Sequence, residues 1–384
     1  MAGGACEISA MKTRAAVLHE IGKPAPYAQS KPLAIEDVDL APPGPGEVMV
    51  RVRAAGLCHS DLSVINGDRP RPTPMVLGHE AAGEIVELGA GVDDIKIGDH
   101  VVMVFVPSCG QCLPCQEGRP ALCEPGAVAN TAGHLLSGAR RFSLNGQPVH
   151  HHVGVSAFSE YTVLSRRSVI PVDATLPFDE AALFGCAVLT GVGAVVNTAQ
   201  IKPGTSVAIV GLGGVGLNAL LAAVLAGAER IVAIDLNADK LKFARQLGAT
   251  DAFNAAQADC IEAVRAATGG GVHTAFEMAG SVKAMELAYR VTRRGGTTVS
   301  AGLAHPQHMW PLQHVNLVAE ERTVKGSYIG SCVPSRDLPR FIRLYRQGKL
   351  PIDRLLSGRV SLDGLNAAFD ELAQGKTARQ VLVM

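Results

Sequence analysis

Two patterns of apolar and polar positions divide the chain. Up to about residue 187, short alternating or β-branched runs are separated by turns rich in glycine and proline. The runs are Val48–Arg53, Glu84–Leu88, His100–Val106 and Glu160–Leu164. Such runs, bounded by turn residues, are typical of short strands. Residues 1–187 are therefore predicted to form a mostly β domain.

From about residue 188, strand-length apolar runs alternate with helix-length segments. The predicted strands are Ser206–Val210, Arg230–Asp235, Val272–Phe276 and Thr297–Ser300, and the predicted helices are Val215–Ala226 and Ala238–Leu247. This alternation predicts an α/β domain over 188–327, a doubly wound parallel sheet with right-handed crossovers. The proline and glycine content rises again over 328–384, so we expect that segment to return to the first domain.

Composition narrows the class of protein. The chain has 384 residues, a length that suits two domains. Hydrophobic residues make up 47% and charged residues 18%, as in globular proteins. Thirty-five basic residues balance thirty-five acidic ones, so charge recruits neither nucleic acid nor an anionic membrane. The first residues lack the apolar segment of a signal peptide, and the run Ala219–Ala228 is too short to span a bilayer. With nine cysteines and no secretory signal, we predict a cytoplasmic protein.

Four cysteines lie within fifteen residues, at Cys109, Cys112, Cys115 and Cys123. Thiolates at this spacing suit one tetrahedral Zn²⁺, with sulfur ligands about 2.3 Å from the metal. The alternative is a disulfide knot of a secreted protein, which a chain of this length does not need. Four cysteine ligands leave no open position on the metal. The segment of about 107–124 is therefore predicted to be a lobe around a structural zinc ion.

A nucleotide-binding pattern follows the first predicted strand of the α/β domain. Gly211-Leu-Gly213-Gly214-Val-Gly216 places glycines for a tight turn, for close approach of a pyrophosphate and for helix packing. Asp235 ends the next strand, 24 residues after Gly211, where a carboxylate accepts hydrogen bonds from ribose hydroxyls and repels a 2′-phosphate. Taken alone, Asp235 could equally be a helix N-cap. The whole pattern predicts NAD rather than NADP.

Three other metal-type residues, Cys58, His79 and Cys186, are far apart in the sequence. Singly, each suits a core thiol or an ordinary histidine, and their spacing does not show that they converge. Their surroundings, however, resemble a family. Gly78-His79-Glu80-x-x-Gly83-x5-Gly89-x-x-Val92 resembles the signature of zinc-dependent alcohol dehydrogenases of the medium-chain dehydrogenase/reductase superfamily. The four-cysteine lobe, the glycine loop and Gly375-Lys-Thr-Ala-Arg379 extend the resemblance from about Lys12 to the end.

The resemblance implies a GroES-like catalytic domain and a catalytic zinc bound by Cys58, His79 and Cys186, with water or substrate in the fourth position. Asp61 and Glu80 match carboxylates that orient such ligands. Zinc then acts as a Lewis acid on the alcohol oxygen, and hydride passes to the nicotinamide. Ser60 matches the hydroxyl that takes the substrate proton. The residues that match coenzyme-binding positions are His59, Thr190, Val215, Lys240 and Arg379; for His59, Lys240 and Arg379 the alternative is an ordinary solvated charge.

The chain departs from its relatives at two positions. Many relatives have a histidine where this chain has Ser63, so proton release is expected to run through water or another base. The stretch from Arg141 to Tyr161 looks most like the glutathione-dependent formaldehyde dehydrogenase branch, whose glutathione-binding arginine is replaced here by Ala127. Arg69 and Arg71 are expected to lie in a solvated, proline-rich loop; the alternative is that they supply a replacement for the missing positive charge. The triplet His150-His151-His152 has a metal site as its alternative, but it is predicted to be a polar turn before a strand, because both zinc sites already have their ligands.

These features lead to one main hypothesis, an NAD-dependent zinc alcohol dehydrogenase acting on primary alcohols. Medium-chain or aromatic substrates are favoured by the expected pocket, which contains Ser60, Ser63, Phe105 and Val153. The alternatives are a glutathione-dependent formaldehyde dehydrogenase and a non-catalytic nucleotide-binding scaffold. The long connection between Cys123 and Glu160 predicts a homodimer, because dimeric relatives keep it. No role is expected for the remaining cysteines, Cys6, Cys260 and Cys332.

Overall fold

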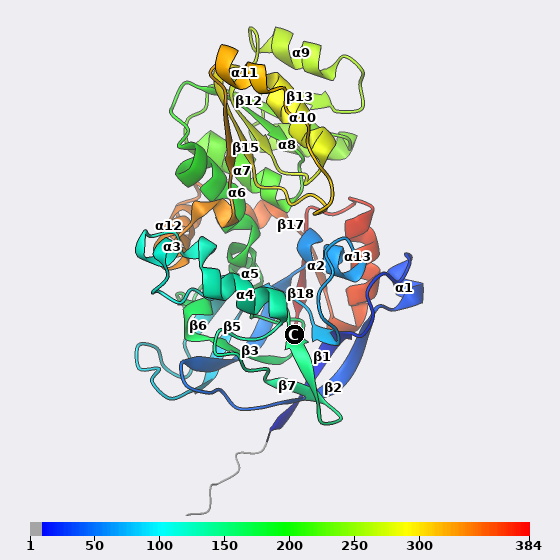
Figure 1. The fold of residues 1–384 in the computed structure, drawn as a ribbon, viewed down its shortest axis with the longest axis vertical. Helices are drawn as coiled ribbons and strands as arrows, with labels where there is room; N and C mark the ends of the chain where they lie inside the picture. The colour runs from blue at the N-terminus through cyan, green and yellow to red at the C-terminus, as the bar shows by residue number, and fades with distance from the viewer. Residues whose placement is uncertain (1–9) are drawn as a thin grey trace, which may run out of the picture. The chain divides into compact units, whose positions relative to one another are not determined.

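The computed structural model describes residues 10–384 and contains two compact units (Figure 1). The β-rich unit takes the chain up to Gly185 and then Gly358–Lys376 and Gln380–Met384. The α/β unit takes Cys186–Ser357 and Thr377–Arg379. The predicted fold class, a Rossmann sheet joined to a mostly β domain, is confirmed. Cys6 lies outside the described residues.

The β-rich unit consists of a small barrel and a seven-stranded sheet. The barrel contains, in order, β1 (Met11–Leu18), β2 (Leu33–Leu40), β7 (Phe142–Leu144), β8 (Gln147–His151) and β4 (Met75–Val76). The sheet order is β10 (Val169–Pro171), β6 (His100–Val104), β5 (Glu80–Leu88), β3 (Glu47–Gly56), β18 (Arg379–Val383) and β17 (Leu356–Val360), with β9 (Tyr161–Ser165) also paired to β3. The four runs predicted to be strands form β3, β5, β6 and β9.

The core of this unit follows the alternation of the strands. Val48, Val50 and Val52 of β3 are buried in one cluster with Ile85 of β5, which lies opposite Val50 in the antiparallel register. Around the sheets lie α1 (Tyr27–Ser30), α2 (His59–Ile65), α5 (Phe178–Ala182) and α13 (Leu365–Ala373). These packed strands give a rigid base for the loops that follow β3 and precede β5, and those loops carry Cys58 and His79.

The α/β unit is built on six parallel strands (Figure 1). Their order is β13 (Asp251–Asn254), β12 (Arg230–Asp235), β11 (Ser206–Val210), β14 (Val272–Glu277), β15 (Thr292–Ser300) and β16 (Thr323–Gly326). This is the order of a doubly wound dinucleotide-binding sheet, in which the chain leaves β11 toward the crevice where strand order reverses. The helices are α6 (Ala187–Gly193), α7 (Gly214–Leu225), α8 (Ala238–Gln246), α9 (Cys260–Ala267), α10 (Val282–Val291), α11 (His314–Ala319) and α12 (Pro334–Arg346).

The C-terminal return differs from the predicted boundary. Residues 328–357 belong to the α/β unit, and the return begins only at Gly358. The reason is α12, whose Leu338, Phe341 and Ile342 are buried, and which packs against α6. Pro334 opens this helix, where its missing N–H costs nothing, so a proline that was counted toward the return to the first domain instead begins a helix of the α/β unit.

The histidine triplet does not form a polar turn. His150 and His151 lie within β8, and His151 and His152 are both buried. The His151 ring lies 5.0 Å from that of Phe142, and its Nε2 accepts the backbone N–H of Arg141. Burial lowers the pKa of His151 to about 3, so it is neutral at physiological pH. The prediction was wrong because alternate residues of this strand face the barrel core.

The remaining cysteines and the apolar helices were also the subject of predictions. Cys260 and Cys332 are buried, and burial raises the pKa of both thiols, as expected for inert core cysteines. No single helix within residues 10–384 has the length and apolar composition to span a membrane; only the bent pair Phe178–Gly185 and Ala187–Ala199, taken together, meets that test.

Candidate active site

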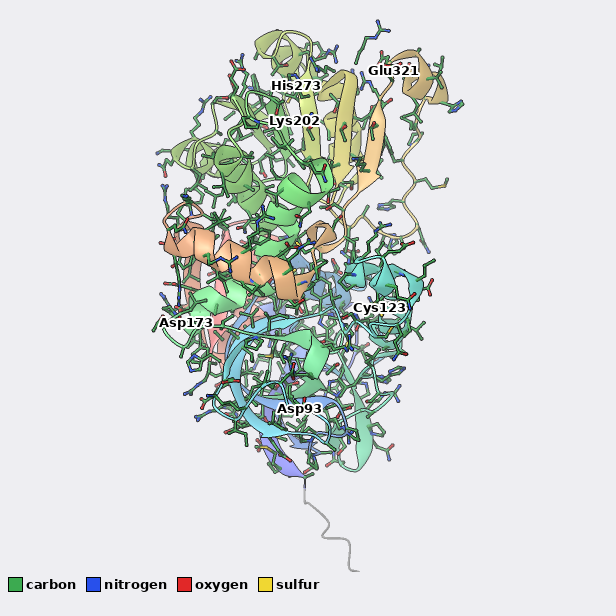
Figure 2. All side chains as sticks on the ribbon, turned by 90° about the vertical axis from the view of Figure 1, so that its left-hand side faces the viewer. Asp93, Cys123, Asp173, Lys202, His273 and Glu321 are labelled. Carbon is green, nitrogen blue, oxygen red and sulfur yellow. The ribbon has the colours of Figure 1, made fainter. Side chains whose placement is uncertain are left out.

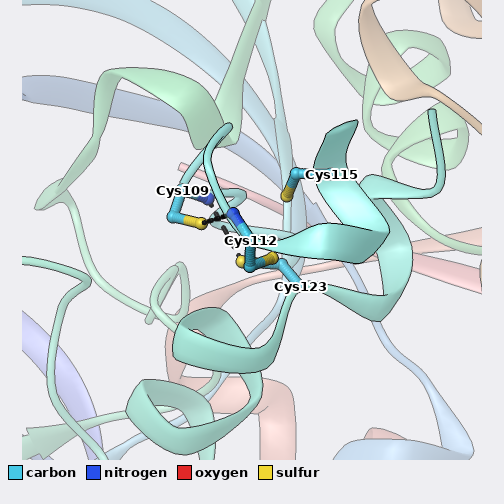
Figure 3. A group of neighbouring side chains, drawn as sticks. All are labelled: Cys109, Cys112, Cys115 and Cys123. Atoms are coloured by element: carbon cyan, nitrogen blue, oxygen red, sulfur yellow. Dashed lines mark hydrogen bonds between the residues drawn. The ribbon is translucent and has the colours of Figure 1, made fainter. Parts of the chain in front are cut away.

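The four lobe cysteines lie side by side and are unoxidised (Figure 3). They lie in the segment that runs from just before α3 (Leu113–Gln116) to the start of α4 (Glu124–Ala132). Figure 2 labels Cys123 in a view of the whole chain. All four Sγ atoms lie within 4.8 Å of one another. Ligands of one tetrahedral zinc ion stand about 3.8 Å apart, so the group fits that metal with little adjustment.

The lobe backbone also prepares these sulfurs for negative charge. The N–H of Cys109 donates to Sγ of Cys123 over 3.1 Å, and the N–H of Cys112 donates to Sγ of Cys109 over 3.3 Å. Backbone N–H groups of Gln111 and Cys112 lower the pKa of Cys109 to about 6, whereas burial raises the pKa of Cys115 to about 12. Burial thus opposes a thiolate at Cys115, and a cation among the sulfurs would favour one.

A second group of ligand atoms unites Cys58, His79 and Cys186, which the sequence could not place together. Their ligand atoms lie within 4.8 Å of one another, and all three residues are buried. Cys58 precedes α2, His79 directly precedes β5, and Cys186 is the first residue of the α/β unit, immediately before α6. Two thiols and one imidazole suit Zn²⁺ and leave the fourth position of a tetrahedron open.

His79 is oriented by Asp61 of α2. Its Nδ1 lies 3.1 Å from Oδ1 of Asp61, and the backbone N–H of Gly78 donates to the same oxygen. Burial acts to lower the pKa of His79, but the Asp61 carboxylate outweighs it and raises the pKa to about 10. Nε2 is buried and has no hydrogen-bond partner among residues 10–384. Because Nδ1 is engaged, this second nitrogen is the one available to a metal ion.

Glu80, the other predicted carboxylate, is fully buried and lies against two glycines. A Cβ added to Gly56 would fall 2.2 Å from its Oε1, and one added to Gly185 would fall 3.2 Å from its Cα. Gly56 stands two residues before Cys58, and Gly185 directly before Cys186. The Glu80 side chain thus occupies space between the two segments that carry the cysteine ligands.

The glycine loop has the geometry that the sequence predicted for nucleotide binding. Gly211 has φ +92°, and a Cβ there would fall 2.8 Å from Ala279. Gly216 packs against the turn, because a Cβ there would fall 1.8 Å from the carbonyl oxygen of Gly211. Gly213 faces open space with nothing within 4 Å. A pyrophosphate can therefore approach the backbone at Gly213, at the start of α7.

Two of the other predicted coenzyme residues of the α/β unit, Asp235 and Arg379, lie against this loop. Asp235 Oδ2 accepts the N–H of Leu212 over 2.7 Å, and its Oδ1 accepts the N–H of Asn237 over 2.9 Å. Arg379 is buried with its side chain over Gly214, where a Cβ would fall 2.4 Å from the Arg379 Cδ. Thr190 is buried on α6, and Lys240 is half-buried on α8.

Comparison with known proteins agrees with this geometry. Residues 44–174 match the model of the alcohol dehydrogenase GroES-like domain, and residues 214–347 match that of zinc-binding dehydrogenases. A Mycobacterium tuberculosis protein named "Putative alcohol dehydrogenase D" is 40% identical over 376 residues, which is 97% of this chain and 100% of that protein. The chain belongs to the zinc-dependent alcohol dehydrogenases of the medium-chain superfamily.

Other relatives of this dehydrogenase carry different names. An S-(hydroxymethyl)glutathione dehydrogenase of Synechocystis is 38% identical over 97% of this chain and 100% of its own. The crystal structure of benzyl alcohol dehydrogenase from Acinetobacter calcoaceticus superposes with a TM-score of 0.90 at 31% identity, covering 97% of this chain and 99% of that one. The relatives thus show the family and its chemistry, and they differ in substrate.

The four residues expected in the substrate pocket of this dehydrogenase have different surroundings. The Phe105 ring lies 5.4 Å from that of His79, edge to face. Ser60 is half-buried in α2, directly before Asp61. Ser63 Oγ donates to the backbone carbonyl of His59 over 2.8 Å, so its proton is committed to the helix. Val153 follows β8 with φ +42°.

One residue near the metal ligands was missed by the sequence reasoning. His152 is buried, its Nδ1 lies 3.2 Å from Oδ1 of Asp61, and its ring stands edge to face with His79 at 5.5 Å. Burial lowers the pKa of His152. Burial opposes ionisation of Asp61, yet the two histidines hold its pKa well below the ordinary value. The only signal in the sequence was the triplet itself, which gave no indication of its partner.

Proposed function

We propose that this chain is an NAD-dependent zinc alcohol dehydrogenase that interconverts primary alcohols and aldehydes. The observation that carries the proposal is the buried group of Cys58, His79 and Cys186, three protein ligands with a fourth position open. Zinc bound there supplies a Lewis acid for the substrate oxygen, and NAD supplies the hydride acceptor. A non-catalytic scaffold would be free to lose one of these ligands, and all three are present and assembled.

The side chains around these ligands orient His79 and transfer the proton of the substrate. Asp61 accepts from His79 Nδ1 and so fixes the ring with Nε2 toward the thiols. Ser60 Oγ accepts the proton of the substrate hydroxyl and passes on its own. Ser63 does not continue the relay, because its hydroxyl is tied to His59 and a serine does not titrate near neutrality. The proton therefore leaves through water or through another base.

The lobe has a separate task. Cys109, Cys112, Cys115 and Cys123 enclose a structural zinc ion with no position left for substrate. The proposal therefore includes two zinc ions per chain, of which only the one at Cys58, His79 and Cys186 takes part in the reaction.

The coenzyme preference is assigned to Asp235. Its two backbone hydrogen bonds fix the carboxylate beside the glycine loop, and they leave lone pairs for ribose hydroxyls. Asp235→Asn keeps the shape and removes the charge that repels a 2′-phosphate. We expect the ratio of kcat/KM with NAD to kcat/KM with NADP to fall about 10-fold or more, a change of about 1.4 kcal/mol. Asp239→Asn, the same change in the exposed first turn of α8, should leave the ratio unaltered. A native enzyme that already prefers NADP would contradict this assignment.

For the substrate, we propose medium-chain or aromatic primary alcohols. Phe105 and Val153 supply apolar surface, and Ser60 is smaller than the threonine common at its position. Each buried methylene contributes about 0.8 kcal/mol, so kcat/KM should rise about fourfold per carbon until the pocket is full.

The second candidate, S-(hydroxymethyl)glutathione, is supported by the Synechocystis relative. Ala127 argues against it, because this exposed residue of α4 stands where the formaldehyde branch has its glutathione-binding arginine.

A panel of substrates decides between these candidates. We expect kcat/KM to be highest for octanol or benzyl alcohol, lower for ethanol, and unchanged for formaldehyde when glutathione is added. If the glutathione adduct is the best substrate, the second candidate stands. If no alcohol, aldehyde or adduct reacts with either coenzyme while both zinc ions are bound, the chain is a scaffold.

We further propose that the enzyme is a cytoplasmic homodimer. The edge strand β16 is exposed along its length, and exposed apolar side chains occur on it and in the segment that precedes it in the sequence. These are Leu303, Met309, Val315, Val318 and Val324. Pairing two β16 edges about a two-fold axis would cover them and satisfy the open strand. Light scattering should give twice the chain mass of 40.0 kDa, and a tetramer would contradict the proposal.

A further inference from the structure

One oxygen of Asp61 is the meeting point of three nitrogen atoms. The backbone N of Gly78 lies 3.2 Å from Oδ1, Nδ1 of His79 lies 3.1 Å from it, and Nδ1 of His152 lies 3.2 Å from it. Asp61 is fully buried, and Oδ2 has no hydrogen-bond partner among residues 10–384. Among the described residues, the nitrogen contacts of this carboxylate are thus all made at Oδ1.

The ionised Asp61 carboxylate determines which nitrogen of His152 must carry a proton. An ionised carboxylate only accepts hydrogen bonds, so an attractive contact requires a proton on Nδ1 of His152. The N–H is not well aligned with the oxygen, but 3.2 Å is within hydrogen-bond reach and Nδ1 has no other hydrogen-bond partner in the described part of the chain. Oδ1 of Asp61 is therefore the acceptor that we assign to this proton.

The backbone around His152 is anchored close to the metal ligands. The N–H of His152 donates to Ser156 Oγ over 2.8 Å, and that hydroxyl donates to the carbonyl of Val76, three residues before His79. Val153 and Ser156 have φ of +42° and +56°, a left-handed conformation that non-glycine residues rarely adopt. A strained turn held by buried hydrogen bonds is thus used to bring this imidazole to Asp61.

We propose that His152 is a positioning residue of the catalytic metal centre: its Nδ1–H restrains the Asp61 carboxylate, and Asp61 in turn orients the His79 ring. The inference rests on the proposed function, since it assigns His79 to the metal. The simpler alternative is that His152 only fills space as a buried ring, in which case any aromatic side chain of similar size serves equally well.

The two alternatives differ in a measurement of metal release. His152→Phe keeps a ring and loses the donor, whereas His152→Asn keeps a donor close to the Nδ1 position. His150→Phe, in the neighbouring position of β8, is the matched control. Each protein, loaded with two zinc ions, is mixed with a chelator, and the release of the more labile ion is followed together with kcat, KM and the melting temperature.

We expect His152→Phe to release the labile zinc about 10-fold faster than the native enzyme, as for partners of metal-ligating histidines generally. His152→Asn should bring the rate of zinc release to within about threefold of the native rate. In His152→Phe, kcat should fall by a larger factor than that by which KM changes. Equal rates in His152→Phe and the native enzyme, or equally fast release from His152→Asn, would overturn the proposal.

A double-mutant cycle tests whether His152 acts through Asp61, and it does not depend on His152→Phe alone folding well, because His152→Leu can take its place. In the Asp61→Asn background, removing the His152 donor should change zinc release less than about twofold. A full 10-fold effect there would show that His152 acts independently of Asp61. A native enzyme that holds only one zinc ion would instead refute the proposed function, whatever the variants do.

Discussion

Replacing Cys186 by serine should leave a folded protein with one zinc ion per chain and almost no dehydrogenase activity. The substitution removes one of three protein ligands from the group with an open position, and the hydroxyl of serine is a poor substitute for a thiolate. Loss of Lewis-acid assistance is worth several kcal/mol of barrier, so kcat/KM should fall about 1000-fold or more. Metal analysis and initial rates, both on the purified variant, check the two expectations.

The matched control for this substitution is Cys260→Ser. It makes the same change of one atom in a buried thiol of the α/β unit that belongs to none of the metal-type groups. It should keep both zinc ions and the native kcat/KM. A small chelating ligand such as phenanthroline should inhibit the native enzyme reversibly through the open position. Retention of two zinc ions by Cys186→Ser would contradict the ligand assignment.

Replacing Cys112 by serine should mainly destabilise the protein. Binding of a structural zinc ion is folding free energy, about 10–16 kcal/mol in small zinc-finger peptides, and only part of that is at stake in a lobe attached to a larger domain. A loss of about 4 kcal/mol corresponds to a melting temperature lower by about 10 °C. Calorimetry of the variant, together with kcat/KM measured at low temperature on the fraction that remains folded, separates stability from chemistry.

Gln111→Ser is the control for the lobe, because it changes only an exposed side chain beside Cys112 and keeps the backbone N–H that Gln111 donates to Cys109 Sγ. Its melting temperature should match that of the native enzyme. If Cys112→Ser melts at the native temperature with two zinc ions bound, the lobe does not hold a structural metal in the proposed way.

Much of the fold could be predicted because its signals are local. Ser206–Val210, the glycine loop and Asp235 lie within one βαβ unit, so their order along the chain already fixes their neighbourhood. The predicted boundary at 328 was wrong for a physical reason. Proline and glycine content does not show which domain a segment packs against, and only the burial of Phe341 and the packing of α12 against α6 show that residues 328–357 belong to the α/β unit.

The site was less accessible to sequence reasoning because it is assembled from distant segments. Cys58, His79 and Cys186 come together only when β3, β5 and the turn before α6 are packed, and only the family resemblance linked them beforehand. The family resemblance did not indicate a role for His152. Its partner Asp61 is 91 residues away, and the alternation that buries His151 also depends on a barrel that single-sequence patterns do not reveal.

Glu80 gives the catalytic ligands a property that the lobe cysteines lack. Its buried side chain lies against Gly56 and Gly185, so the segments that end in Cys58 and Cys186 are spaced by a part of the protein and not by the metal. Little conformational entropy then remains to be lost when zinc arrives, which favours tight binding to a preorganised site. A zinc ion held there would be able to leave and return without the surrounding chain unfolding. A side chain added at Gly56 would press on the Glu80 carboxylate, and one added at Gly185 would press on the carbonyl oxygen of Met103, so either change would disturb this spacing.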